Sequence, residues 1–152
     1  MRVSALLLCL LLVGCGAPPA PVTKTQPDPT AEPWYASTVK QLADLNQQAR
    51  NSLDRGKRDE AAGYIMRGQD LSHKLLSVIR PTLGAAQAAS DLDQLYGEML
   101  LANRHYGWAR LSFQKNVARW KHWKPQSADT AARLKQAESQ IAECDRKMSE
   151  SK

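Results

Sequence analysis

From Trp34 to the end of the chain, apolar side chains recur every three or four residues, which is the spacing of one face of an α-helix. The first repeat holds Val39, Leu42, Asn46, Ala49 and Leu53 and ends at the charged segment 55–58. The second runs from about residue 59 to 79, and we expect it to turn inward Ala61, Ile65, Leu75, Leu76 and Ile79, with Gly68 and Ser72 as small spacers. Pro81 ends this helix, because proline cannot continue the helical hydrogen bonds.

The third repeat is the longest in the chain. Its members are Leu92, Leu95, Met99, Ala102, Tyr106, Ala109, Phe113, Val117 and Trp120. The repeat passes Gly97 and Gly107 without changing phase, whereas a turn between two helices usually resets it. We therefore expect one helix over residues 85–122, ended by Pro125. The alternative is two helices that meet near residues 105–107.

A last repeat holds Leu134, Ala137, Ile141, Cys144 and Met148, and either Ser127 or Asp129 is suited to cap its start. Short connections make consecutive helices antiparallel neighbours. Ala, Leu, Gln, Lys and Arg dominate the composition and there is a single Phe, which favours helices over strands. The sequence therefore predicts an all-α domain over residues 34–152, an elongated bundle of about four antiparallel helices.

The N-terminus carries the most specific motif. Arg2 precedes an apolar run over residues 3–13 that is too short to span a bilayer, and the run ends in Leu12-Val13-Gly14-Cys15. This order resembles the lipobox of bacterial lipoproteins. The resemblance implies that residues 1–14 are a signal peptide and that Cys15 becomes the acylated N-terminal residue, which holds the protein to a membrane. The alternative is an ordinary secretory signal that happens to contain a cysteine.

Residue 16 bears on the destination of such a lipoprotein. An aspartate directly after the lipid-bearing cysteine would resemble an inner-membrane retention signal, but this chain has Gly16 there. The resemblance therefore implies the cell envelope, at the outer membrane facing the periplasm. Residues 16–33 hold six of the eight prolines and show no apolar repeat. With Cys15 they are expected to form a disordered tether over residues 15–33, long enough to hold a domain on the order of 50 Å from the membrane.

One predicted helix connection resembles the turn of a tetratricopeptide repeat, and a second set of positions matches a further unit. Gly56 lies between two predicted helices and Ala61 follows five residues later, as in that family, while Gly97, Ala109 and Phe113 match a second unit. The two units are 48 residues apart, against about 34 in the family, and the closing proline is missing. The resemblance implies stacked helical hairpins and is a loose one.

Residues 104–124 combine three of the four tryptophans with six Lys or Arg and no acid. Helical phase divides them: Tyr106, Phe113 and Trp120 continue the apolar repeat and are expected in the core. The remaining side chains form a candidate binding face of Arg104, Trp108, Leu111, Lys115, Arg119 and Trp123, with His122 on the same arc. This face either binds an anionic or apolar partner or is a solvated basic surface.

Reactive chemistry has little support. His73, His105 and His122 lie far apart in the sequence, and neither paired metal ligands nor a phosphate-binding glycine loop is present. Cys144 is the one cysteine left after Cys9 and Cys15 are assigned, and we expect it to be a buried apolar residue. The sequence therefore predicts no enzyme, no cofactor and no metal.

The net charge of +6 falls to +5 when Arg2 is removed with the signal peptide. A basic surface suits nucleic acid, but export of the protein argues against that partner. Two functions remain. One is a helical adaptor that docks a protein partner in an envelope assembly, by analogy with small helical-repeat lipoproteins that act as pilots or assembly subunits. The other is an envelope-surface binder of anionic glycan or lipid.

Overall fold

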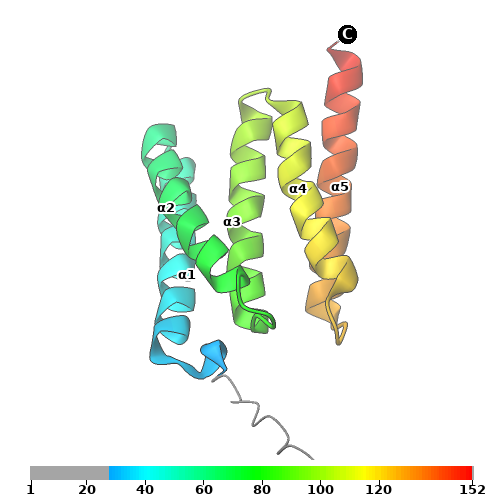
Figure 1. Ribbon diagram of the computed structural model, residues 1–152. Coiled ribbons are helices and arrows are strands. Elements are labelled where there is room, and N and C mark those ends of the chain that lie inside the picture. Colours follow the sequence, from blue (N-terminus) through cyan, green and yellow to red (C-terminus); the bar gives the residue numbers. More distant parts are fainter. Residues whose placement is uncertain (1–27, 152) are drawn as a thin grey trace, which may run out of the picture.

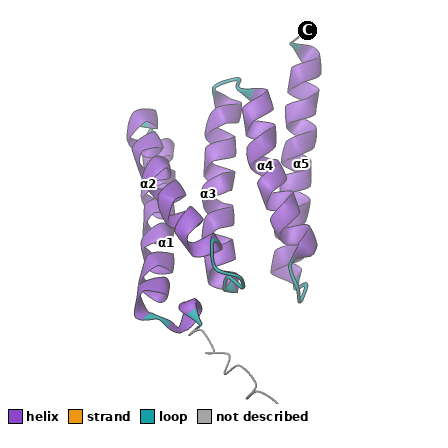
Figure 2. Cartoon of the chain, in the orientation of Figure 1, coloured by secondary structure: helices purple, strands orange, loops and turns teal. Residues whose placement is uncertain are grey.

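The computed structural model describes residues 28–151, and all of the regular structure in this part of the chain is helical, which confirms the all-α class (Figures 1 and 2). A short 3₁₀ turn, η1, precedes five helices that alternate in direction along the chain. The elements are η1 (Pro29–Ala31), α1 (Pro33–Asp54), α2 (Arg58–Leu76), α3 (Leu83–Ala102), α4 (Tyr106–His122) and α5 (Ala128–Glu150).

The expectation of one long helix over residues 85–122 is wrong. The chain turns at residues 103–105, so that α3 and α4 form an antiparallel hairpin. A three-residue connection is close to the 3.6 residues of one helical turn, and the spacing of apolar side chains therefore passes through it unchanged. The apolar pattern alone cannot distinguish this turn from continued helix.

The α1–α2 and α3–α4 turns have the same backbone structure. Gly56 and Arg104 both adopt left-handed φ angles, of 73° and 62°. In each turn the next residue donates a backbone hydrogen bond to the carbonyl five positions back, Lys57 to Ser52 at 2.8 Å and His105 to Leu100 at 2.9 Å. This is the Schellman arrangement that ends many helices. The two turns lie 48 residues apart, the separation noted for the tetratricopeptide-like positions.

Small residues bring the helices close together where the sequence suggested it. Ala61 and Ala109 are fully buried. Gly97 lies under the buried ring of Phe113, and a Cβ atom at Gly97 would stand 2.6 Å from the Cζ of that ring. The α3–α4 hairpin therefore owes its close approach to a glycine.

The core has two parts that share α3. The first lies between α1, α2 and α3 and includes Leu42, Ile65, Leu75, Leu92 and Leu95. The second lies between α3, α4 and α5 and consists of Leu100, Ala109, Phe113 and Cys144. Because α3 contributes to both parts, it is the central element of the bundle.

Helix ends agree with the sequence in one place and differ in another. The Ser127 side chain accepts a hydrogen bond from the Thr130 amide at 3.2 Å, which confirms Ser127 as the cap of α5. In contrast, α2 ends at Leu76, and Ile79 is 98% exposed instead of facing inward. The prediction for Ile79 fails because the chain leaves the helix before reaching the Arg80-Pro81 step. Among the described helices, none has the length and apolar character that crossing a bilayer demands.

Candidate functional site on helix α4

Helix α4 has an inner face that is fixed by packing. Phe113 and Trp120 are fully buried, as the helical phase predicted, whereas Tyr106 at the start of the helix is half-buried. The indole Nε1 of Trp120 donates to the Ser90 hydroxyl at 2.8 Å, and the Asn116 amide donates to the Ser90 carbonyl at 3.0 Å. These bonds fix the rotation of α4 against α3 and determine which side chains face outward.

The outer face of α4 exposes two large apolar side chains. Trp108 is 67% exposed and Leu111 is 50% exposed. They are three residues apart, so their side chains are neighbours on the helix surface. Lys115 follows one turn later, with 60% of its side chain exposed. We call Trp108, Leu111 and Lys115 the outer stripe of α4.

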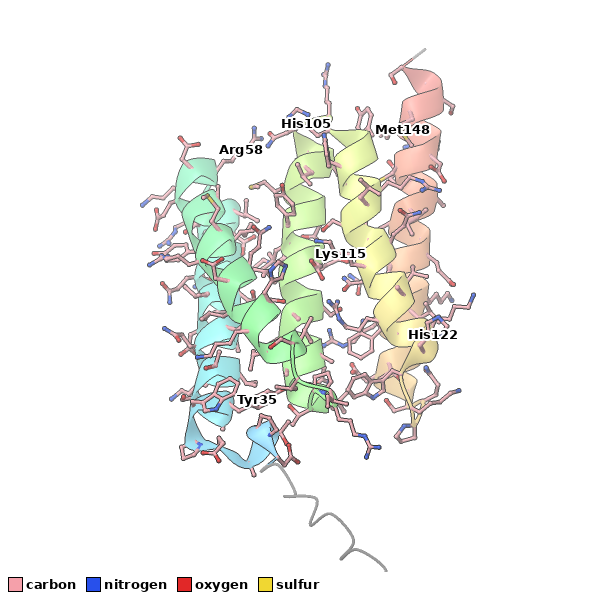
Figure 3. The ribbon with its side chains drawn as sticks, viewed as in Figure 1. Tyr35, Arg58, His105, Lys115, His122 and Met148 are labelled. Atoms are coloured by element: carbon pink, nitrogen blue, oxygen red, sulfur yellow. The ribbon has the colours of Figure 1, made fainter. Side chains whose placement is uncertain are left out.

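The cations of α4 are largely engaged by acids on neighbouring helices. Arg119 donates to the Asp93 carboxylate of α3 at 2.9 Å. The ammonium of Lys115, which Figure 3 labels on α4, lies 3.7 Å from the same carboxylate. Arg110 pairs with Asp145 of α5 at 2.7 Å. Only 13% of the Arg119 side chain is exposed, so the expectation that Arg119 faces solvent is wrong.

Asp93 is the residue that sequence reasoning missed. Its carboxylate holds Arg119 and faces Lys115, and its backbone carbonyl accepts a hydrogen bond from the Ser112 hydroxyl at 2.8 Å. Asp93 lies on a different helix from the basic run, and no local pattern in the sequence relates the two. Pairing across the α3–α4 hairpin is visible only once the turn at 103–105 is known.

The remaining members of the candidate face are separated in space. Arg104 occupies the α3–α4 turn, at the start of α4, while Trp123 follows the last residue of the helix. The Trp123 ring is half-buried and stands edge-to-face on Trp120, with ring centroids 5.9 Å apart. The structure therefore brings together the outer stripe but not all six predicted residues.

The described residues offer little reactive chemistry near this face. A groove of about 430 Å³ lies between α2 and α4 above α3 and includes His73, Asp93 and Lys115 in its lining. No cluster of three or more metal-ligating side chains occurs between residues 28 and 151. Burial raises the pKa of the Cys144 thiol, and nearby Asp145 and Glu143 raise it further, so that the thiolate form is disfavoured at neutral pH. With two exposed apolar side chains and one cation, the outer stripe is suited to contact.

The residue predicted to carry lipid, Cys15, lies outside the described residues, as does the segment that follows it as far as residue 27. Comparison of the whole chain with models of protein families, with curated proteins and with solved structures gave no match.

Proposed function

We propose that this chain is a lipoprotein of the bacterial cell envelope that acts as a helical adaptor. In this proposal Cys15 carries the lipid that holds the protein to the membrane, and the outer stripe of α4 docks a protein partner. The motif Leu12-Val13-Gly14-Cys15 supports the anchor. The exposure of Trp108 and Leu111 supports the docking role and is the observation that carries the proposal.

Adjacent exposed apolar side chains on a well-packed helix are typical of a protein-binding surface. The inner face of α4 is fully used by the core, so Trp108 and Leu111 cannot be buried by a small rotation of the helix. Tryptophan is also the residue type most often found at the energetic centre of an interface. A partner that buried these two side chains would gain about 3–5 kcal/mol from the apolar area alone.

The alternative function, an anionic glycan or lipid bound by the basic face of α4, has less support. Asp93 neutralises much of the charge that Arg119 and Lys115 would offer, and Asp145 does the same for Arg110. An anionic ligand would have to compete with these carboxylates. Nothing in the geometry of the described residues favours nucleic acid.

Site-specific photocrosslinking in intact cells tests the docking role. A photoreactive residue at Trp108 or at Leu111 should capture the same single envelope protein, because the two side chains are neighbours. Met66 provides the matched control, since it is an apolar residue with 68% exposure on α2 and lies outside the outer stripe. Leu111→Asp should abolish capture from position 108 without changing the helical circular dichroism.

Equal capture of abundant envelope proteins from positions 66, 108 and 111 would contradict the adaptor role. Binding of the protein to anionic vesicles or sacculi at low salt, abolished by Lys115→Gln with Arg119→Gln, would favour the alternative function instead. In that case a photoreactive residue at position 108 should capture no single envelope protein.

Acyl labelling tests the anchor separately. Cys15→Ala should remove the incorporated fatty acid and leave an unprocessed or soluble species, because the thiol is the predicted site of lipid attachment. Cys144→Ala is the control and should label normally, since Cys144 is buried in the core. Unchanged labelling of Cys15→Ala would contradict the lipoprotein assignment.

A further inference from the structure

One end of the bundle exposes aliphatic side chains beside the point where the described chain begins, at Asp28. Helix direction alternates, so this end contains the start of α1, the α2–α3 connection and the α4–α5 connection (Figure 1). Ile79, in the α2–α3 connection, is 98% exposed, and Leu83, at the start of α3, is 41% exposed. Moving aliphatic surface of this kind out of water lowers the free energy.

An aromatic ring and two cations lie next to this exposed connection. A hollow of about 780 Å³ opens beside it, and its lining includes Trp34, Val78, Ile79, Lys74 and Arg80. The Lys74 ammonium stands 4.6 Å from the centroid of the Trp34 ring. Tryptophan and basic side chains beside exposed aliphatic ones are typical of protein surfaces that lie at the boundary between lipid headgroups and acyl chains.

The net charge of this end is positive. Asp129 is already paired with Arg133 at 3.0 Å, and the other acids here are Asp28 and Glu32. Against these two carboxylates stand four cations, Lys74, Arg80, Lys121 and Lys124. Within residues 28–151, none of the four forms an ion pair with an acid. Among the Lys and Arg side chains of α4, Lys121 is therefore the one that forms no ion pair with a described acid, and it lies at this end.

We propose that this end of the bundle rests on the surface of an anionic lipid bilayer, with Ile79 and Leu83 among the headgroups. We call it the membrane end and define it by residues 28–35, 74–84 and 121–129. The inference rests on the lipid anchor of the proposed function and adds an orientation to it. Cys15 and Asp28 are thirteen residue steps apart, which span at most about 45 Å, and the chain enters the bundle at this end.

The short connection makes docking of the membrane end an intramolecular event. A lipid on Cys15 keeps the bilayer within reach of Ile79 and raises its effective concentration, so weak contacts suffice to hold the bundle down. The cations add attraction to anionic headgroups. The opposite end of the bundle, which holds the α1–α2 and α3–α4 turns, shows no exposed large aliphatic side chain among its turn residues.

Spin labelling of the full, lipidated chain in vesicles tests the orientation. Ile79→Cys receives a nitroxide, and Asp54→Cys, at the last residue of α1 and so at the opposite end, is the matched control. Both variants also carry Cys144→Ala, and Cys15 is occupied by lipid, so labelling is confined to the introduced cysteine. In vesicles of phosphatidylcholine with phosphatidylglycerol, the label at 79 should collide with a water-soluble nickel chelate at least about threefold less than the label at 54.

Collisions with oxygen dissolved in the bilayer should rise at position 79 in the same vesicles. Lys121→Gln with Lys124→Gln should lower the ratio of docked to undocked protein by about fivefold for each charge removed. Equal nickel accessibility at positions 79 and 54, in protein that carries acyl label and floats with the vesicles, would overturn the orientation and leave the anchor intact. Protein that carries no acyl label and does not float would instead show that the anchor itself is wrong.

Discussion

At the residue scale, the glycines inside helices differ in how closely other atoms pack against them, and the sequence does not show this difference. Gly97 is buried beneath the Phe113 ring, whereas Gly63 lies on an exposed part of α2 where an added Cβ would meet no atom within 4 Å. Both are interior helical positions, where glycine costs about 0.5–1 kcal/mol relative to alanine. Packing, and not propensity, therefore decides the effect of replacing either one.

The first prediction contrasts these two glycines. Gly97→Ala should lower the free energy of unfolding by about 1–2 kcal/mol, because the overpacking against Phe113 exceeds the gain in helix propensity. Gly63→Ala should raise it by about 0.5–1 kcal/mol. Urea unfolding followed by circular dichroism measures both. A gain in stability for Gly97→Ala would show that the Phe113 ring can move aside at little cost.

Prediction of single buried residues from the sequence succeeded where burial depends only on which face of a helix the residue occupies. Phe113 and Trp120 were predicted to be core residues and are fully buried. Ile79 and Arg119 were placed wrongly. Ile79 is exposed because α2 ends before it. Arg119 is largely covered because it pairs with Asp93, an acid 26 positions away on another helix. Neither is encoded in the local apolar spacing.

At the scale of elements, the two hairpin turns offer a natural comparison. Both place one residue in the left-handed region, Gly56 in the first turn and Arg104 in the second. Glycine adopts this conformation freely, while other L-residues lose roughly 1–2 kcal/mol there. The first turn was predictable because it contains glycine. A break near the second turn was only the alternative to one continuous helix, because arginine gives no such signal and the connection is one helical turn long.

The second prediction exchanges the chemistry of the two turns. Arg104→Gly should stabilise the bundle by about 0.5–1 kcal/mol, because the strain at φ 62° is relieved and Arg104 takes part in no ion pair with another described residue. Gly56→Ala should destabilise it by about 1 kcal/mol for the converse reason. Thermal unfolding measures both changes.

Arg104→Ala is the control for loss of the arginine side chain. It keeps a Cβ atom in the left-handed region, so its stability should stay near that of the parent chain. If Arg104→Ala stabilised the bundle as much as Arg104→Gly, the gain would come from removing the side chain and its charge. Backbone strain at position 104 would then make no contribution to the change in stability.

At the scale of the molecule, the proposed membrane contact and the proposed partner contact lie at different positions along the length of the bundle. The membrane end holds the aliphatic connection at Ile79 and Leu83. Trp108 lies in the first turn of α4, near the opposite end, and Trp123 follows the last turn. Fifteen residues of helix separate these two tryptophans by about 22 Å. A bundle standing on its membrane end would therefore present the outer stripe away from the lipid, toward a partner.

Stability should also differ across the molecule, because α3 is shared by both core parts and α5 is not. Helix α5 buries only Thr130, Ala137 and Cys144, and it packs mainly on α4. Its polar contacts with α3 include the Arg133–Asp91 ion pair at 2.6 Å and the Gln87–Asp129 hydrogen bond at 3.0 Å. Exposed pairs of this kind contribute little each.

The third prediction is that α5 opens before the rest of the bundle unfolds. Native-state hydrogen exchange should give the α5 amides an opening free energy at least about 2 kcal/mol below that of the α3 amides. The Cys144 thiol should react with an added disulfide reagent through the same opening, because the closed state buries it completely. Opening free energies from the two methods should therefore agree.

Acid should favour this opening over global unfolding. The hydrogen bond from Gln87 and the nearby Arg133 lower the pKa of Asp129 below its ordinary value of 3.8. A lowered folded-state pKa means that the carboxylate stabilises docked α5 above pH about 4 and loses this effect as the pH falls through that pKa. Asp129→Asn should remove this part of the pH dependence. Equal protection of α3 and α5 at every pH would mean that the bundle unfolds as one unit, in spite of the small core beneath α5.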